Sequence, residues 1–177
     1  VAVLGRAMAR ALDAAGAPAP ASIGLILSDD SELADLDRTH MGEPGPTDVL
    51  SFPLLPPETF PPHDGRAEVA SGDAASSAID IPAPTAFVPP GRRLHLGDIV
   101  VSVERAAAQA VEGRGGHTGD VRWSPADELR LLVIHGTLHV CGWDHAEPVE
   151  EREMRALERR LLETSVPAVT APAVTAR

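Results

Sequence analysis

The spacing of hydrophobic side chains predicts an amphipathic helix near each end of the chain. In both segments these side chains recur every three or four residues, which is the helical period. The positions are Leu4, Met8, Ala11, Leu12 and Ala15 near the N-terminus, and Met154, Leu157, Leu161 and Leu162 within residues 150–163. Each of these two helices is therefore expected to bury one face.

Three shorter hydrophobic runs predict strands, because they are short and bounded by turn-forming residues. They comprise residues 22–27, 47–52 and 94–102. Pro53 ends the second run, since proline cannot donate a ladder hydrogen bond. Helices are expected at residues 31–38 and 104–112. Strands and helices joined by connections of very different length predict an α+β fold with a small sheet.

A further helix is expected over residues 125–141. Ser124 is a favoured N-cap, Pro125 suits the first helical position, and the acidic residues Asp127 and Glu128 favour the positive end of the helix dipole. Residues 129–134 are hydrophobic almost all round the helix. This pattern predicts that the helix is central and buried.

The composition changes between residues 53 and 93. This stretch holds many of the chain's prolines and offers few large hydrophobic side chains to bury, which predicts a long, largely disordered insertion. Residues 164–177 show no period and are expected to form a flexible tail. We therefore expect a single domain over residues 1–163.

The charge and cysteine content narrow the possible functions. The 177 residues carry 26 acidic and 15 basic side chains, for a net charge of −11. Such a chain repels nucleic acid at long range, although a local basic patch and a metal can still hold it. The single Cys141 cannot form an internal disulfide, which indicates a reducing, cytoplasmic setting. No hydrophobic run approaches the roughly 18–20 residues of a membrane span, so no membrane partner is expected.

Three of the seven histidines lie in one short segment, at His135, His139 and His145. The first two share a helix face, and Gly142 lets the helix end so that the third can return toward them. They can be ordinary residues of a buried helix, but this spacing favours metal binding. Three neutral imidazoles leave one tetrahedral position open, which is typical of a catalytic zinc site. The segment predicts a metal-dependent hydrolase with one Zn²⁺ per chain.

The residues around these histidines have two readings each. Asp144 either orients an imidazole or shapes the turn, and the turn is slightly favoured. Cys141 is expected to have a core or capping role rather than to bind metal. Trp143 is expected to be a packing residue rather than a platform for substrate. The histidine spacing also matches the long zincin pattern of metzincin peptidases, which carry Glu directly after the first histidine. Gly136 occupies that position here, so a peptidase is the weaker alternative.

Residues 135–145, His-Gly-Thr-Leu-His-Val-Cys-Gly-Trp-Asp-His, resemble the signature of the YbeY family. Residues 46–53, Pro-Thr-Asp-Val-Leu-Ser-Phe-Pro, and residues 96–100, Leu-Gly-Asp-Ile-Val, resemble two further blocks of that family in the same order. The resemblance covers residues 1–163 apart from the insertion. It implies a zinc-binding endoribonuclease of bacterial ribosomal RNA maturation and ribosome quality control.

The resemblance also implies a small mixed β-sheet flanked by about five helices, with zinc on the three histidines. It implies action on the 3′ end of 16S RNA, with ribosomal RNA and the small ribosomal subunit or its proteins as partners. Single-stranded RNA is the expected target, because its backbone can be splayed into a metal cleft. Asp48 and Asp98 lie in the other two blocks and are candidates for a catalytic base or an orienting acid. Their alternative role is to cap strands and loops.

Two departures from the family pattern affect these expectations. Met41 stands where many members carry a substrate-facing Arg, so this positive charge is either lost or supplied by Arg38, Arg92 or Arg93. The family's first strand has no counterpart ahead of the first helix, which predicts an exposed sheet edge. A non-catalytic, zinc-binding ribosome-assembly factor remains the alternative to an enzyme.

Overall fold

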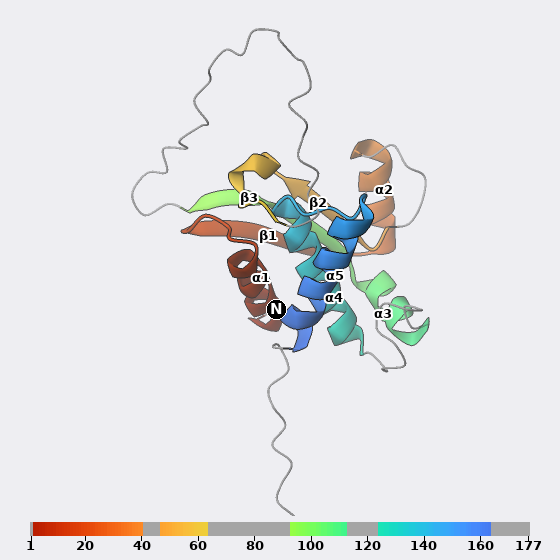
Figure 1. The fold of residues 1–177 in the computed structure, drawn as a ribbon. Coiled ribbons are helices and arrows are strands. Elements are labelled where there is room, and N and C mark those ends of the chain that lie inside the picture. Colours follow the sequence, from red (N-terminus) through yellow and green to blue (C-terminus); the bar gives the residue numbers. More distant parts are fainter. Residues whose placement is uncertain (1, 41–46, 64–92, 113–123, 164–177) are drawn as a thin grey trace, which may run out of the picture.

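The computed structural model describes residues 2–40, 47–63, 93–112 and 124–163 (Figure 1). Within these ranges, five α-helices accompany a three-stranded sheet, which confirms the expected α+β fold. The elements are α1 (Ala2–Ala14), β1 (Ala21–Ser28), α2 (Asp30–His40), β2 (Val49–Pro53), the short 3-10 helix η1 (Pro57–Thr59), β3 (Leu94–Ser102), α3 (Val103–Glu112), α4 (Pro125–Val140) and α5 (Pro148–Glu163).

The sheet is mixed and has the order β1-β3-β2. β1 runs parallel to the central strand β3, and β2 runs antiparallel to it. Both β1 and β2 are therefore edge strands of the described sheet. Pro53 is the last residue of β2, where a missing N–H donor is tolerated.

The two faces of the sheet pack against different helices. Ile99 and Val101 of β3 belong to the main core, which α1, α4 and α5 complete. Val100, between them in sequence, points to the other face and packs with Leu33 of α2 and Leu50 of β2. This alternation follows from the pleat of the strand and places α4 and α2 on opposite sides of the sheet.

Helix α4 occupies the centre of the molecule, as its hydrophobic pattern predicts (Figure 1). It contacts α1, α3, α5 and two strands of the sheet. Ser124 and Asp127 form a capping box at its start, in which each side chain binds the other residue's backbone N–H. A fixed start and burial on all sides hold the helix in one position, so side chains at its far end have defined places.

The predicted insertion begins too early. Residues 54–63 are part of the described fold, and they include η1 and the side chain of Phe60, which is 4% exposed in the main core. The abundance of proline suggested disorder, but one buried aromatic side chain anchors the segment. The remaining part of the predicted insertion, residues 64–92, and the predicted tail, residues 164–177, lie outside the described residues.

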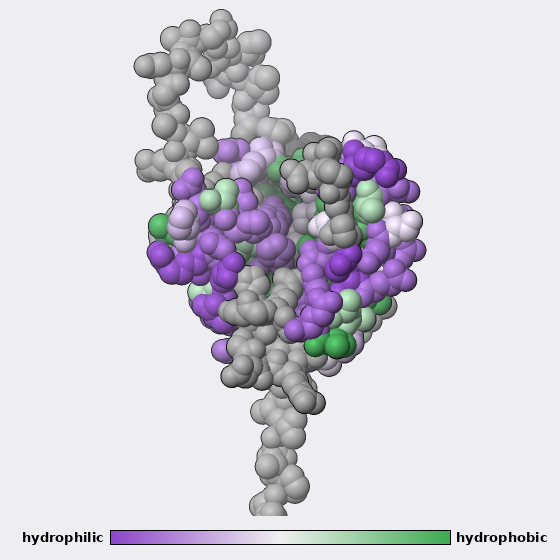
Figure 2. Space-filling model, turned by 90° about the vertical axis from the view of Figure 1, so that its right-hand side faces the viewer, coloured by the Kyte–Doolittle hydropathy of each residue, from purple (hydrophilic) through white to green (hydrophobic). Residues whose placement is uncertain are grey.

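One face of the molecule is mainly polar. Figure 2 shows a predominantly hydrophilic face on which hydrophobic residues form small, separate areas. In the described part of the chain, none of the helices is both long enough and hydrophobic enough to cross a membrane.

Candidate metal centre

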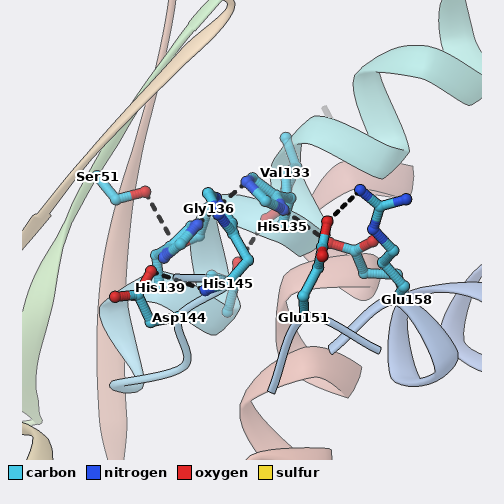
Figure 3. Close-up of polar contacts among 11 residues, drawn as sticks. Ser51, Val133, His135, Gly136, His139, Asp144, His145, Glu151 and Glu158 are labelled. Atoms are coloured by element: carbon cyan, nitrogen blue, oxygen red, sulfur yellow. Dashed lines mark hydrogen bonds and ion pairs between the residues drawn. The ribbon is translucent and has the colours of Figure 1, made fainter. Parts of the chain in front are cut away.

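The three histidines singled out by the sequence converge at the C-terminal end of α4 (Figure 3). His135 and His139 lie one turn apart on this helix, and His145 returns from the loop that follows it. One nitrogen from each ring lies within 4.8 Å of the other two. The Nε2 atoms of His135 and His139 are 3.1 Å apart. In the described residues, this is the one group of His, Cys, Asp or Glu side chains arranged to hold a metal.

The return of His145 depends on the turn after α4. Gly142 has a φ of +81°, a left-handed conformation that glycine adopts readily. The backbone N–H of Trp143 donates to the carbonyl of Leu138 at 3.1 Å, which closes the turn. The backbone N–H of His145 donates to Oδ1 of Asp144 at 2.7 Å. This contact supports the turn-shaping role expected for Asp144.

Glu158 fixes the orientation of His135. Its Oε1 lies 2.7 Å from Nδ1 of His135, and the Glu158 residue is only 8% exposed. Because a carboxylate only accepts, Nδ1 carries the proton and donates it. Nε2 of His135 is left with a free lone pair that points toward the other two rings. Hydrogen bonding of this kind sets the tautomer of many metal-binding histidines.

Glu158 was not among the predicted site residues, although the sequence pattern held a signal for it. Glu158 follows the buried Met154 by four residues, so it lies on the hydrophobic face of α5. A carboxylate there needs a buried partner. Glu150, four residues before Met154, is buried for the same reason. Its Oε1 accepts a hydrogen bond of 2.9 Å from the backbone N–H of Asp144 and so ties α5 to the histidine loop.

Residues 57–63, which the sequence placed in the predicted insertion, also support the loop that carries His145. The ring of His63 stacks on Trp143 with centroids 3.8 Å apart and an angle of 5° between the planes. Nε2 of His63 lies 3.5 Å from Oε1 of Glu150. A Cβ on Gly142 would lie 3.0 Å from Cα of Pro57, so the turn packs closely against η1. The packing role expected for Trp143 is therefore confirmed.

Burial adjusts the chemistry of two side chains. Burial, together with the neighbouring rings of His135 and His145, lowers the pKa of His139 to about 4. His139 is therefore neutral near pH 7 and has a lone pair for a metal. Burial raises the pKa of the Cys141 thiol to about 12. Cys141 is 1% exposed and lies in the main core, as expected.

Gly136 lets α4 lie directly on the sheet. A Cβ at this position would be 2.8 Å from Cγ2 of Ile99, 3.1 Å from Oγ of Ser51 and 3.2 Å from Cγ2 of Val49. Oγ of Ser51 also donates to the carbonyl of Gly136 at 3.2 Å. The metzincin glutamate occupies the equivalent position, and here the sheet leaves no room for it.

The two candidate catalytic acids have other polar partners in the structure. The side chain of Asp48 accepts a hydrogen bond from Nε2 of Gln109 at 3.0 Å. Oδ1 of Asp98 lies 3.2 Å from Nε2 of His95. Since Ile99 faces α4, the adjacent Asp98 points from the opposite face of the sheet. Neither acid belongs to the metal-binding group of the described residues, and a catalytic role for either stays a prediction.

The basic residues considered as replacements for the family's arginine are only partly described. Met41 and Arg92 lie outside the described residues. Arg93 is exposed just before β3. Arg38 lies on α2, where its guanidinium pairs with Asp35 at 2.7 Å. Because α2 covers the face of the sheet opposite α4, Arg38 is poorly placed to face the histidines.

The three imidazoles fit a zinc ion. Zn–N distances of about 2.0–2.1 Å and tetrahedral angles place neighbouring ligand nitrogens about 3.3 Å apart. The observed separation of 3.1 Å between two of them is close to this value. One ring has its tautomer set by Glu158 and a second is kept neutral by burial. Three protein ligands leave one position for water or substrate.

Comparison with known proteins gives a consistent result. The family model described as Endoribonuclease YbeY matches residues 2–165. A Salinispora tropica protein named Endoribonuclease YbeY is 43% identical over 152 residues, which cover 86% of this chain and 79% of that protein. Proteins of the same name from Mycolicibacterium gilvum and Mycobacterium leprae are 41% and 42% identical over 143 residues. These matches cover 81% of this chain and 63% of each relative, slightly less than two thirds of their length.

Proposed function

This chain belongs to the YbeY family, and we propose that it is a zinc-dependent endoribonuclease that cleaves single-stranded RNA during maturation of the 3′ end of 16S ribosomal RNA. The observation that carries this proposal is the three-histidine group, with an open coordination position, in a chain that matches endoribonucleases over nearly its whole length. The reaction is hydrolytic or transesterifying cleavage of a phosphodiester.

The described residues account for the binding and orientation of the metal. His135, His139 and His145 would hold zinc, which supplies Lewis acidity to a phosphate oxygen and to water. Glu158 keeps the His135 proton on Nδ1 and the lone pair on Nε2. Glu150 and the Gly142 turn hold the loop that carries His145. Asp48 and Asp98 are proposed to act as base or orienting acid, each tested by its Asn variant.

The position of Gly136 argues against the peptidase alternative. A zincin peptidase needs a glutamate directly after the first histidine as general base. A side chain larger than hydrogen at this position meets Ile99, Ser51 and Val49 of the sheet. A ribosome-assembly factor with a structural zinc is disfavoured because structural sites normally have four protein ligands.

Ribosomal RNA within the small subunit is the proposed substrate, and the subunit's proteins are the proposed partners. With a net charge of −11, the chain repels RNA at long range. A ribosomal protein that positions the RNA would compensate for this. We propose a cytoplasmic location, because a chain with a single cysteine forms no internal disulfide and suits a reducing compartment.

The test is cleavage of a ribosomal RNA 3′-end fragment by the zinc-loaded protein, with the same sequence in duplex form and a peptide substrate alongside. We expect cleavage of the single strand alone and its loss in His139→Ala. His40→Ala is the matched control, because His40 is exposed and lies at the end of α2. Cleavage of peptide, or equal RNA cleavage by the His139→Ala variant, contradicts the proposal.

A further inference from the structure

An open hollow of about 250 Å³ lies along one side of α5. Its lining consists of Pro148, Glu151, Arg152, Arg155 and Arg159. At 3.6 residues per turn, positions 148, 152, 155 and 159 fall on one face of the helix. Three guanidinium groups therefore line one open hollow in a chain with a net charge of −11, in which all 15 basic residues are arginines.

This hollow borders the metal centre. Helix α5 begins three residues after His145, and its residue Glu158 binds His135. Glu158 lies between Arg155 and Arg159 in sequence, and Glu151 of the hollow is on the same side of α5 as Glu158. Figure 3 shows Glu151 and Glu158 together beside His135. The arginine face thus continues from the edge of the three-histidine group along the length of α5.

The side chains of the hollow are suited to phosphate. A guanidinium group binds two phosphate oxygens at once through a planar pair of N–H donors, and it stays charged at all relevant pH values. Within the hollow, Glu151 pairs with Arg155 and holds it against the helix. Arg152 lies 3.9 Å from Glu153, a long and exposed pair that contributes little. The lining keeps a net charge of +2 from three arginines and one glutamate.

We propose that Arg152, Arg155 and Arg159 bind successive phosphates of the single-stranded RNA whose next phosphodiester lies at the metal centre. This inference rests on the proposed function and extends it, because it assigns the RNA-binding surface of that site. The arginine face of α5 supplies local positive charge in a chain whose net charge is −11. An extended, single strand suits this surface because the arginines follow one helix face.

The experiment compares two neighbouring arginines. Arg159→Gln removes one charge from the hollow, and Arg160→Gln removes one charge about 100° further round α5, on the side away from Glu158. Affinity for a short single-stranded RNA is measured against salt concentration with the full zinc-loaded chain, and again after chelation so that binding is read without cleavage. A third variant combines Arg152→Gln, Arg155→Gln and Arg159→Gln.

Counterion release sets the expected size of the effect. Each lost phosphate contact lowers the slope of log affinity against log salt by about 0.7 and weakens binding about fivefold at 0.1 M salt. We expect this change for Arg159→Gln, a slope change of about 2 for the triple variant, and none for Arg160→Gln. Thermal unfolding checks that the variants remain folded.

Other outcomes overturn the proposal. Equal slopes for Arg159→Gln and Arg160→Gln mean that only overall charge matters. Competition by inorganic phosphate, with no gain in affinity from longer RNA, identifies a small-anion site. An acidic peptide is measured as a further ligand, and substitutions that weaken only its binding identify a protein site.

If the slopes change as expected but the zinc-loaded chain cuts no RNA, the proposed function fails and the RNA surface stands. If RNA is cut and the slopes stay constant, only the surface is wrong.

Discussion

Substitution of Gly136 by alanine tests how closely α4 must approach the sheet. Alanine normally gains about 1 kcal/mol over glycine inside a helix. Here the new Cβ would lie 2.8 Å from Cγ2 of Ile99, well inside the optimal separation of about 3.5–4.0 Å. Ile99 is fully buried, and Ser51 and Val49 close two other directions. Overpacking of this kind costs about 1–3 kcal/mol, and three close contacts favour the upper part of that range. We therefore expect Gly136→Ala to destabilise the protein by about 1–2 kcal/mol.

Gly5→Ala is the matched control, because Gly5 is an exposed position within α1 and a Cβ there would meet nothing within 4 Å. The same exchange should leave stability unchanged or raise it by up to about 1 kcal/mol. Urea unfolding of both variants measures the difference. Gly136→Ala should also weaken zinc binding, since moving α4 away from the sheet shifts His135 and His139 relative to His145. A Gly136→Ala variant as stable as Gly5→Ala would refute the close packing of α4 on the sheet.

Three further predictions concern other parts of the molecule. Glu158→Gln should weaken zinc binding about 10-fold, the lower end of the usual range for residues that hydrogen-bond a metal ligand, whereas Glu163→Gln at the exposed end of α5 should not. Competition with a zinc-chelating dye measures both affinities. Equal affinities would contradict the role of Glu158. Cys141 should resist alkylation at pH 8 in the folded protein, because its pKa of about 12 keeps it a thiol, and should react once the chain is unfolded; rapid labelling under native conditions, read by mass spectrometry, would oppose this. Phe60→Ala should lower the free energy of unfolding by about 3–5 kcal/mol if residues 54–63 are part of the core. A loss below about 1 kcal/mol would mean that this segment does not contribute to the core.

The elements with a strong local signal were predictable from the sequence. β3 has the predicted bounds, and α4 begins at the predicted Pro125, where the capping residues mark the start. The convergence of the three histidines was also predictable, because helical spacing and one glycine turn are both local features. In each case, residues close together in the sequence carry the signal.

The parts that depend on distant contacts were not predictable in the same way. Residues 54–63 read as disordered because their composition is rich in proline, and only the packing of Phe60 in the core orders them. Glu158 takes its role from a residue 23 positions earlier, across the contact between α4 and α5. The pleat of β3 points Asp98 away from α4, and its catalytic role stays a prediction. The partners of Phe60 and Glu158 depend on tertiary packing, which the sequence pattern does not specify.

The most direct test of the central claim is RNA cleavage measured during zinc titration of the chelated protein. The fragment is the single-stranded 3′ end of 16S RNA, and zinc content is read in parallel by native mass spectrometry. The account predicts that cleavage rises with zinc, saturates at one ion per chain, and is absent in His145→Ala, which should bind zinc much more weakly. Full cleavage without zinc, or one bound zinc in the wild type with no cleavage at all, would contradict it.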